Sequence, residues 1–122
     1  MTTLLDSCIL IDCLARHAPA RACIQSQVRP AISLITWMEV MVGGPKAGND
    51  PIVRKFLDAF EILPIDDDIA EATVAIRRTR RLKLPDAILL ATARVHRLTF
   101  VTRNTKDFEA DEPGILIPYR IL

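Results

Sequence analysis

The stretch TLLDSCILIDCL, residues 3–14, joins a short strand-like run to a helix and places an acidic residue between them. Thr3, Leu4 and Leu5 form the expected strand, which ends on Asp6. Ser7 is a residue type that caps helices, and the apolar residues after it predict a helix through position 14. The same order, a short apolar strand and then a helix, continues along the chain.

Four more apolar runs are predicted to be strands, at residues 30–33, 62–65, 98–101 and 115–118. Helices are expected at about residues 20–27, 36–41, 51–60, 70–76 and 87–93, and the last should be central because it is apolar on nearly every face. Residues 43–45 are expected to end one helix, and residues 47–51 to form a loop with Pro51 in the first turn of the next helix. Short strands alternating with helices predict a parallel sheet of about five strands covered on both faces, an α/β/α sandwich.

The composition is that of one folded domain, residues 1–122, without internal repeat or linker. Half of the residues are hydrophobic, which is rich for so short a chain, so some apolar surface is expected to be buried against a partner. The formal net charge is +1, which excludes a global basic field, so any contact with nucleic acid must depend on local patches.

Cys8, Cys13 and Cys23 are odd in number and are not spaced as Cys-x-x-Cys, so neither a disulfide framework nor a zinc knuckle is expected. Buried free thiols in a reducing compartment are the simpler interpretation. No apolar run reaches the ~20 residues that cross a bilayer, and the N-terminus lacks a basic signal region. We therefore expect a cytoplasmic protein.

Acidic and amide side chains follow several of the predicted strands. Asp6 ends the first strand, Glu39 lies shortly after the second, Asp86 begins the apolar helix, and Asn104 and Asp107 follow the fourth strand. Ligands of open parallel sheets collect beyond the carboxyl ends of the strands, so these side chains are expected at one edge.

Each acid also has a purely structural interpretation. Asp86 could cap its helix, where free N–H groups favour a negative charge, Asp6 could belong to a turn, and Glu39 could be solvated. However, Glu39 lies between apolar residues of its predicted helix, and an unpaired acid buried there would be costly. Converging carboxylates raise one another's pKa, and a hard divalent cation such as Mg²⁺ removes that repulsion. The constellation therefore suits metal-assisted hydrolysis of a phosphodiester.

Four segments in series resemble the motifs of the PIN-domain nucleases: residues 4–11 (LLDSCILI), 33–39 (SLITWME), 85–93 (PDA followed by ATA) and 101–108 (VTRN followed by DF). The resemblance covers essentially the whole chain, and at this length it is strongest to the VapC toxins of toxin–antitoxin pairs. It implies endonucleolytic cleavage of RNA with Mg²⁺ or Mn²⁺, a homodimer, and inhibition by a small cognate antitoxin.

The resemblance also implies roles for residues. Asp6 and Asp86 would be the principal metal ligands, and Glu39 would complete the site directly or through water. Asp107 would be the fourth acid, although some relatives place that acid where Asn104 stands. Ser7 and Thr102 would support a carboxylate or a bound water. Cys8 departs from the family, which often has Asn there, and we expect little effect, although a thiol is a weak hydrogen-bond donor that could loosen Asp6.

A basic cluster precedes Asp86 in the chain and comprises Arg77, Arg78, Arg80, Arg81 and Lys83. Its members are equally consistent with a solvated helix face and with contacts to RNA phosphates, for which Arg77, Arg78, Arg81 and Lys83 are the candidates. Arg77 and Arg81 are expected to share a helix side if the preceding helix extends that far. Aromatic residues are few, so stacking on bases should be limited. Arg16, His17 and Arg21 form a second, weaker candidate patch.

A toxin ribonuclease has two alternatives. A catalytically inactive PIN-like module that only binds RNA or protein would keep the fold without needing the acids. A phospho-receiver domain is rejected, because the second N-terminal acid and the lysine after the last strand are missing. The identity of the RNA is not encoded in any of these patterns.

Overall fold

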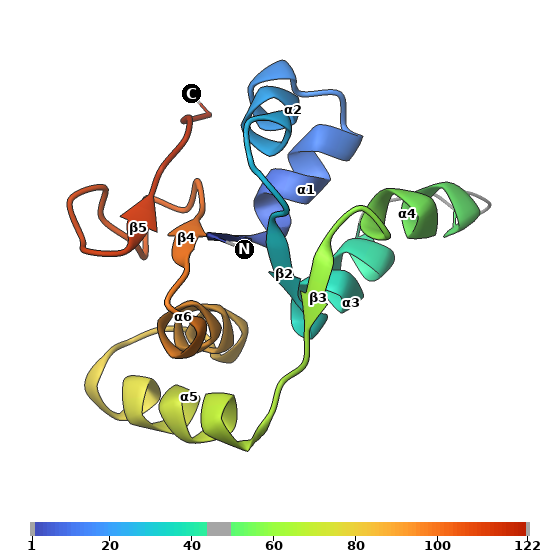
Figure 1. Cartoon of the computed structure of the whole chain (residues 1–122). Coiled ribbons are helices and arrows are strands. Elements are labelled where there is room, and N and C mark those ends of the chain that lie inside the picture. The colour runs from blue at the N-terminus through green and yellow to red at the C-terminus, as the bar shows by residue number, and fades with distance from the viewer. Residues whose placement is uncertain (1, 44–49, 122) are drawn as a thin grey trace.

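The computed structural model describes residues 2–43 and 50–121, and its centre is a parallel sheet (Figure 1). Within these residues five strands lie in the order β3-β2-β1-β4-β5. They are β1 (Thr3–Leu5), β2 (Ala31–Ser33), β3 (Glu61–Leu63), β4 (Thr99–Val101) and β5 (Ile115–Leu116), and every neighbouring pair is parallel. The expected α/β architecture with about five parallel strands is confirmed.

Alternate residues of the strands enter two separate hydrophobic layers. Leu4 and Phe100 pack with the buried face of α6, whereas Leu5 and Val101, their chain neighbours, pack with α1 and α3. Successive side chains of a strand point to opposite faces, so two adjacent apolar residues require cover on both sides. The continuous apolar character of these strands is thus the reason that helices cover both faces.

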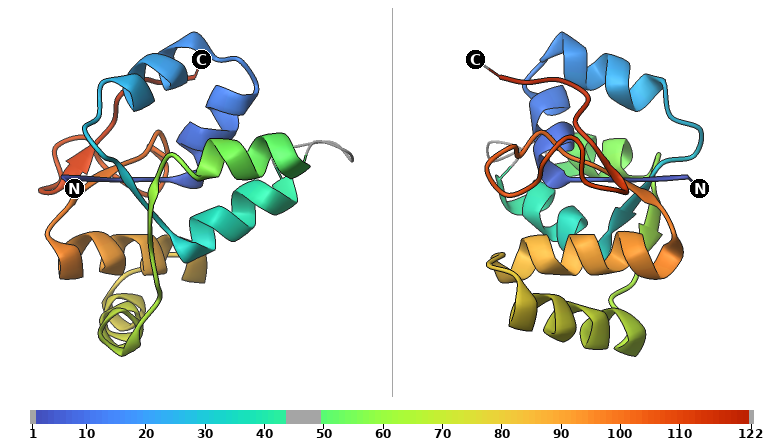
Figure 2. Two further views of the ribbon diagram at one scale, coloured as in Figure 1. Left: turned by 45° about the vertical axis from the view of Figure 1, so that its right-hand side comes forward. Right: turned by 90° about the vertical axis from the view of Figure 1, so that its left-hand side faces the viewer.

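Six helices are present in the described ranges: α1 (Ser7–Leu14), α2 (Ala18–Gln25), α3 (Leu34–Gly43), α4 (Asp50–Leu57), α5 (Asp67–Thr79) and α6 (Leu84–His96). α5 and α6 lie together on one side of the sheet, and α1 lies on the other (Figures 1 and 2). The C-terminal tail after β5 returns to α1 and α2 (Figure 2).

Helix α6 is central, as its apolar sequence predicts. Residues Ala87 and 89–93 are buried, and Arg97 ends the helix in the left-handed conformation with φ of 56°. Because α6 leads directly into the parallel strand β4, its N-terminus lies at the carboxyl edge of the sheet. This arrangement delivers Asp86, in the first turn of α6, to the same edge as Asp6.

Several boundaries differ from the predictions. Asp6, rather than Ser7, occupies the N-cap position of α1 and makes no side-chain cap bond. Helix α3 begins at Leu34 rather than Thr36, and α4 begins at Asp50 and contains Pro51 in its first turn. Helix α5 ends at Thr79, where the chain becomes extended at Arg80 and Leu82 turns into the core, so Arg81 shares no helix face with Arg77. The predicted breaks at 44–45 and 47–49 lie outside the described residues.

The cysteines are free, but only Cys23 is fully buried, whereas Cys8 and Cys13 are half-buried. In the portion of the chain that is described, none of the helices is both long and apolar enough to cross a membrane.

Candidate functional site

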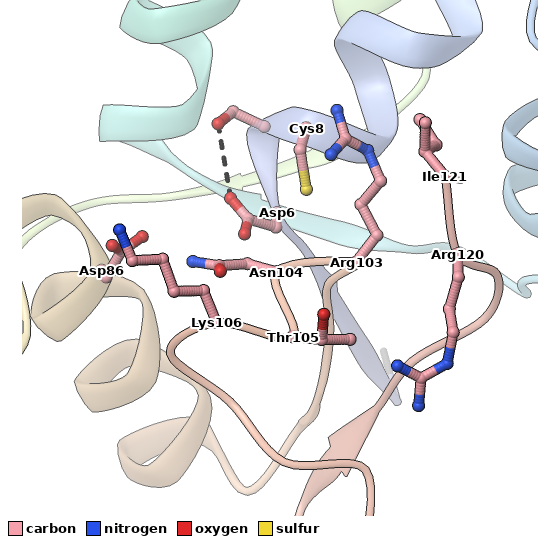
Figure 3. Close-up of a pocket in the computed structure, with 10 residues that line it drawn as sticks. Asp6, Cys8, Asp86, Arg103, Asn104, Thr105, Lys106, Arg120 and Ile121 are labelled. Carbon is pink, nitrogen blue, oxygen red and sulfur yellow. Dashed lines mark hydrogen bonds between the residues drawn. The ribbon is translucent and has the colours of Figure 1, made fainter.

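Asp6 directly follows the central strand β1, and its backbone N–H donates to the carbonyl of Val101 at 2.9 Å. Its side chain is 5% exposed, and both carboxylate oxygens accept hydrogen bonds. Thr102 Oγ1 donates to Oδ2 at 2.7 Å. Ser7 Oγ donates to Oδ1 at 3.3 Å, the bond drawn as a dashed line in Figure 3. The carboxylate is therefore held in one orientation at the edge of the sheet.

Two more carboxylates lie in the electrostatic field of Asp6. Burial raises the pKa of Asp86, and the charges of Asp6 and Asp107 raise it further. Burial also raises the pKa of Glu39, followed by the charge of Asp6, while Asp86 adds to the rise and Ser7 opposes it. Burial is the larger cause of both rises, and the convergence of carboxylates predicted from the sequence adds to it.

Asn104 and Asp107 bind each other in the loop after β4. Asn104 Nδ2 donates to Asp107 Oδ2 at 2.9 Å, and the backbone N–H of Asp107 donates to Asn104 Oδ1 at 3.3 Å. The backbone N–H of Asn104 in turn donates to Thr102 Oγ1 at 3.1 Å. The two candidates for the fourth ligand, Asn104 and Asp107, thus form one unit that is bonded to Thr102, the hydrogen-bond donor to Asp6.

A cavity of about 440 Å³ opens at this edge (Figure 3). Its walls combine acids with cations, and the lining residues are Asp6, Ser7, Cys8, Asp86, Arg103, Asn104, Thr105, Lys106, Arg120 and Ile121. Asn104, rather than Asp107, reaches the cavity wall. Glu39 lies beside it, on a neighbouring and more apolar groove that also contains Ser7 and Met38.

The donor set fits a hard divalent cation. Oxygen ligands surround the edge, and the raised pKa values of Glu39 and Asp86 show repulsion that a bound cation would relieve. Among the residues that the structure describes, no three His, Cys, Asp or Glu side chains meet closely enough to form a ready-made metal cluster. Mg²⁺ typically takes only one or two carboxylates directly and completes its shell with water.

The basic cluster divides into two parts. A separate pocket of about 360 Å³ at the junction of α5 and α6 is lined by Arg77, Arg78, Arg80 and Arg81. Lys83 is the N-cap residue of α6, and its charge partly opposes the rise in the pKa of Asp86 that burial and the nearby acids cause. Arg16, His17 and Arg21 line a third pocket at the α1–α2 junction.

Several residues of the site were not singled out from the sequence. Arg103 and Lys106 stand between the motif residues Thr102 and Asp107, so the run VTRNTKDF did contain a signal for them. Arg120 carried no local signal, because it reaches the cavity only through the return of the C-terminal tail.

Comparisons with known proteins agree with this geometry. The model of the PIN domain family matches residues 3–111. The chain is similar to a chain of a toxin–antitoxin complex from Klebsiella pneumoniae, at 50% identity and a TM-score of 0.92, covering 98% of this chain and 100% of that one. A search of curated protein sequences found no significant match.

Two further solved structures are similar. One is DNA-bound VapBC from Salmonella typhimurium, with 27% identity, a TM-score of 0.75 and coverage of 96% of each chain. The other is FitAcB from Neisseria gonorrhoeae, with 24% identity, a TM-score of 0.79 and coverage of 98% of this chain and 100% of that one, which supports the fold alone. With a family model that spans 109 residues, and with acids of all four motifs gathered at one edge of the sheet, the chain belongs to the PIN domain family.

Proposed function

We propose that this chain is a Mg²⁺- or Mn²⁺-dependent endoribonuclease, that residues 1–122 form one nuclease domain, and that the protein is the toxin of a toxin–antitoxin pair acting in the cytoplasm. The observation that carries the proposal is the electrostatic coupling of Glu39 and Asp86 to the buried Asp6 at the carboxyl edge of a PIN-domain sheet. Such coupling is unfavourable without a cation and suits catalysis at a phosphate.

In this proposal Asp6 and Asp86 hold the metal, and Glu39 completes the site directly or through water. When bound, the cation supplies an activated water and stabilises negative charge on the phosphate. Thr102 and Ser7 keep the carboxylate of Asp6 aimed at the site through the two hydrogen bonds described above. Asp107 is the fourth acid, which Asn104 holds in place by donating from its amide.

The cations around the acids are proposed to bind the RNA backbone. Lys106 and Arg120 line the same cavity as Asp6 and Asp86, where they can contact the phosphate that is cleaved or its neighbour. Arg77, Arg78, Arg81 and Lys83 are proposed to contact phosphates farther along the strand. Such contacts position RNA without reading its sequence.

A small antitoxin and a second copy of the chain are the proposed partners. The similarity to chains of toxin–antitoxin complexes supports the first. Exposed apolar side chains on α3 and α4 support a protein interface, since Val42 is 87% exposed and Ile52 is 66% exposed.

Substitution of the two principal acids tests the enzymatic part. D6N and D86N, singly and together, keep the size of the side chain and remove its charge. We expect cleavage of total RNA in Mn²⁺ to fall by about 100-fold or more, since changes merely beside a metal ligand already cost 10–100-fold. D58N, at an exposed position after α4, is the matched control and should cleave normally.

Cleavage by the purified D6N/D86N protein at the rate of the D58N control would overturn the proposal. If no form of the chain cleaves RNA but the native chain still binds it, the inactive binding module becomes the better description.

A further inference from the structure

Arg80 differs from the other members of the basic cluster in that its charge is already paired. Its Nη1 donates to Glu112 Oε2 at 2.7 Å, and its Nη2 donates to Glu112 Oε1 at 2.9 Å. Nη2 also donates to the backbone carbonyl of Asp107 at 2.8 Å. The side chain is 29% exposed and that of Glu112 is 18% exposed. With three hydrogen bonds made inside the chain and its charge paired with Glu112, Arg80 is less suited to contact RNA than its neighbours are.

The same guanidinium lies over the ring of Phe108, with 5.2 Å from Cζ to the ring centroid. Phe108 is fully buried and meets Phe100 of β4 edge-on, at 5.2 Å between ring centroids. Arg80 therefore grips the loop after β4 at three points: the Asp107 carbonyl, the Phe108 ring and the Glu112 carboxylate. The loop is also anchored in the hydrophobic core, through the packing of Phe108 against Phe100.

A continuous series of hydrogen bonds leads from this loop to Asp6. The Asp107 carboxylate accepts from Asn104, the backbone N–H of Asn104 donates to Thr102 Oγ1, and Thr102 donates to Asp6. The series therefore ends in the segment that Arg80 holds through the Asp107 carbonyl. Movement of that segment would reach Asp6 through Asn104 and Thr102.

We propose that Arg80 is a positioning residue that holds the Asn104–Asp107 segment against the acidic edge and thereby sets the affinity of the site for its divalent cation. The link to the cation rests on the proposed function, whereas the anchoring of the loop does not. Arg80 acts through the segment and contacts neither the cation nor RNA.

The test compares R80Q with R29Q. Arg29 also pairs with a glutamate, Glu61, at 3.3 Å, but that pair is exposed and lies on the β2–β3 side of the sheet, far from this loop in the strand order. The first measurement is hydrogen exchange by NMR on metal-free protein, at the backbone amides of Asp107 and Phe108, both of which donate to Asn104. R80Q should lower their protection by about tenfold, and R29Q should leave it unchanged.

The second measurement is the dissociation constant for Mn²⁺, obtained by calorimetry without RNA. R80Q should raise it by about 3- to 10-fold, less than the effect of replacing a residue bonded directly to a metal ligand, and R29Q should not change it. Native-like amide protection and Mn²⁺ affinity in R80Q would overturn the proposal.

Two further variants separate geometry from charge and replace R80Q if it does not fold. R80K keeps the charge but cannot make the bidentate contact with Glu112. It should therefore lose part of the amide protection and part of the affinity for Mn²⁺. E112Q leaves the bond to the Asp107 carbonyl and should show a smaller loss in the same direction. Full recovery in R80K would show that charge alone suffices and would overturn the positioning role. If the native chain binds no Mn²⁺, the proposed function fails, and the exchange measurement still decides whether Arg80 anchors the loop.

Discussion

At the scale of single residues, the hydroxyl of Thr102 connects two parts of the acidic edge. It is completely buried, donates to Asp6 and accepts from the backbone of Asn104, so it joins the end of β1 to the loop after β4. Cys8 is its other polar neighbour, with Sγ 3.9 Å from Thr102 Oγ1. Burial, followed by the charge of Asp6, raises the pKa of Cys8 to about 12, so the thiol stays protonated and is a poor ligand or nucleophile.

We predict that T102V lowers cleavage and Mn²⁺ affinity by about 10- to 100-fold while the fold is kept, because Asp6 loses the donor that fixes its carboxylate. The control is T73V, which removes the hydroxyl of another buried threonine, one that donates to the Ile69 carbonyl inside α5. Circular dichroism and metal-dependent cleavage of the two variants give the comparison. An equal loss in both would mean that Thr102 matters only for stability.

At the scale of elements, a buried polar group joins α1, the loop after β4 and the C-terminal tail. Asp12 Oδ2 accepts from Tyr119 Oη at 2.7 Å and from Arg103 Nε, and its Oδ1 accepts from Arg103 Nη2 at 3.1 Å. Tyr119 also stacks at a tilt against His17, with 5.0 Å between ring centroids. This group holds the tail that carries Arg120 to the cavity.

We predict a pH-dependent loss of stability for D12N. Burial alone would raise the pKa of Asp12, but hydrogen bonds from Arg103 and Tyr119 outweigh it, and the pKa lies below its ordinary value. A lowered pKa stabilises the fold above the unfolded value of about 4, and that stabilisation disappears as the pH falls through the folded value. D12N should therefore be less stable than the native chain by about 1–3 kcal/mol at pH 7.

The difference should shrink as the pH falls below about 4, as measured by urea unfolding at several pH values. D58N, which removes an exposed acid, should stay within about 0.5 kcal/mol of the native chain throughout. A difference for D12N that is constant from pH 3 to 7 would contradict the ionic part of this account.

At the scale of the whole molecule, basic and acidic residues are nearly equal in number but are unevenly distributed in space. Sixteen basic and fifteen acidic residues leave a net charge of +1, yet Asp6, Glu39, Asp86 and Asp107 lie at one edge of the sheet with cations around the cavity. Two hydrophobic layers stabilise the sheet that brings these acids together. This stabilisation offsets the electrostatic repulsion between the acids at the edge. A bound cation should therefore stabilise the entire domain.

We predict that Mn²⁺ at about 100 times its dissociation constant adds about 2.7 kcal/mol to the free energy of unfolding, because only the folded state gathers the acids. For a domain of this size, that corresponds to a rise in Tm of about 10 °C by differential scanning calorimetry. D6N/D86N should show no rise, and KCl at the same ionic strength should have no comparable effect on the native chain. A Tm that is independent of Mn²⁺ in the native chain would contradict the metal site.

The alternation of strands and helices follows directly from the amino-acid sequence, because apolar runs of strand length must be covered on both faces. The sequence also predicted which acids would share an edge, since residues after parallel strands must end on the same side. Helix ends were less certain: nothing local shows that α5 stops at Thr79, because the stop depends on Leu82 being buried and on Arg80 finding Glu112.

The contacts that complete the acidic edge depend instead on how distant parts of the chain pack together. Arg80 and Glu112 are 32 residues apart in the chain, and Asp12 and Tyr119 are 107 apart, so neither pairing has a local pattern. From the sequence, Asn104 and Asp107 are alternatives for the fourth ligand, whereas in the structure two hydrogen bonds join them into one unit. The physical reason is that hydrophobic periodicity specifies which face of an element is buried, whereas the partners of a polar side chain depend on the distance and angle at which distant elements pack.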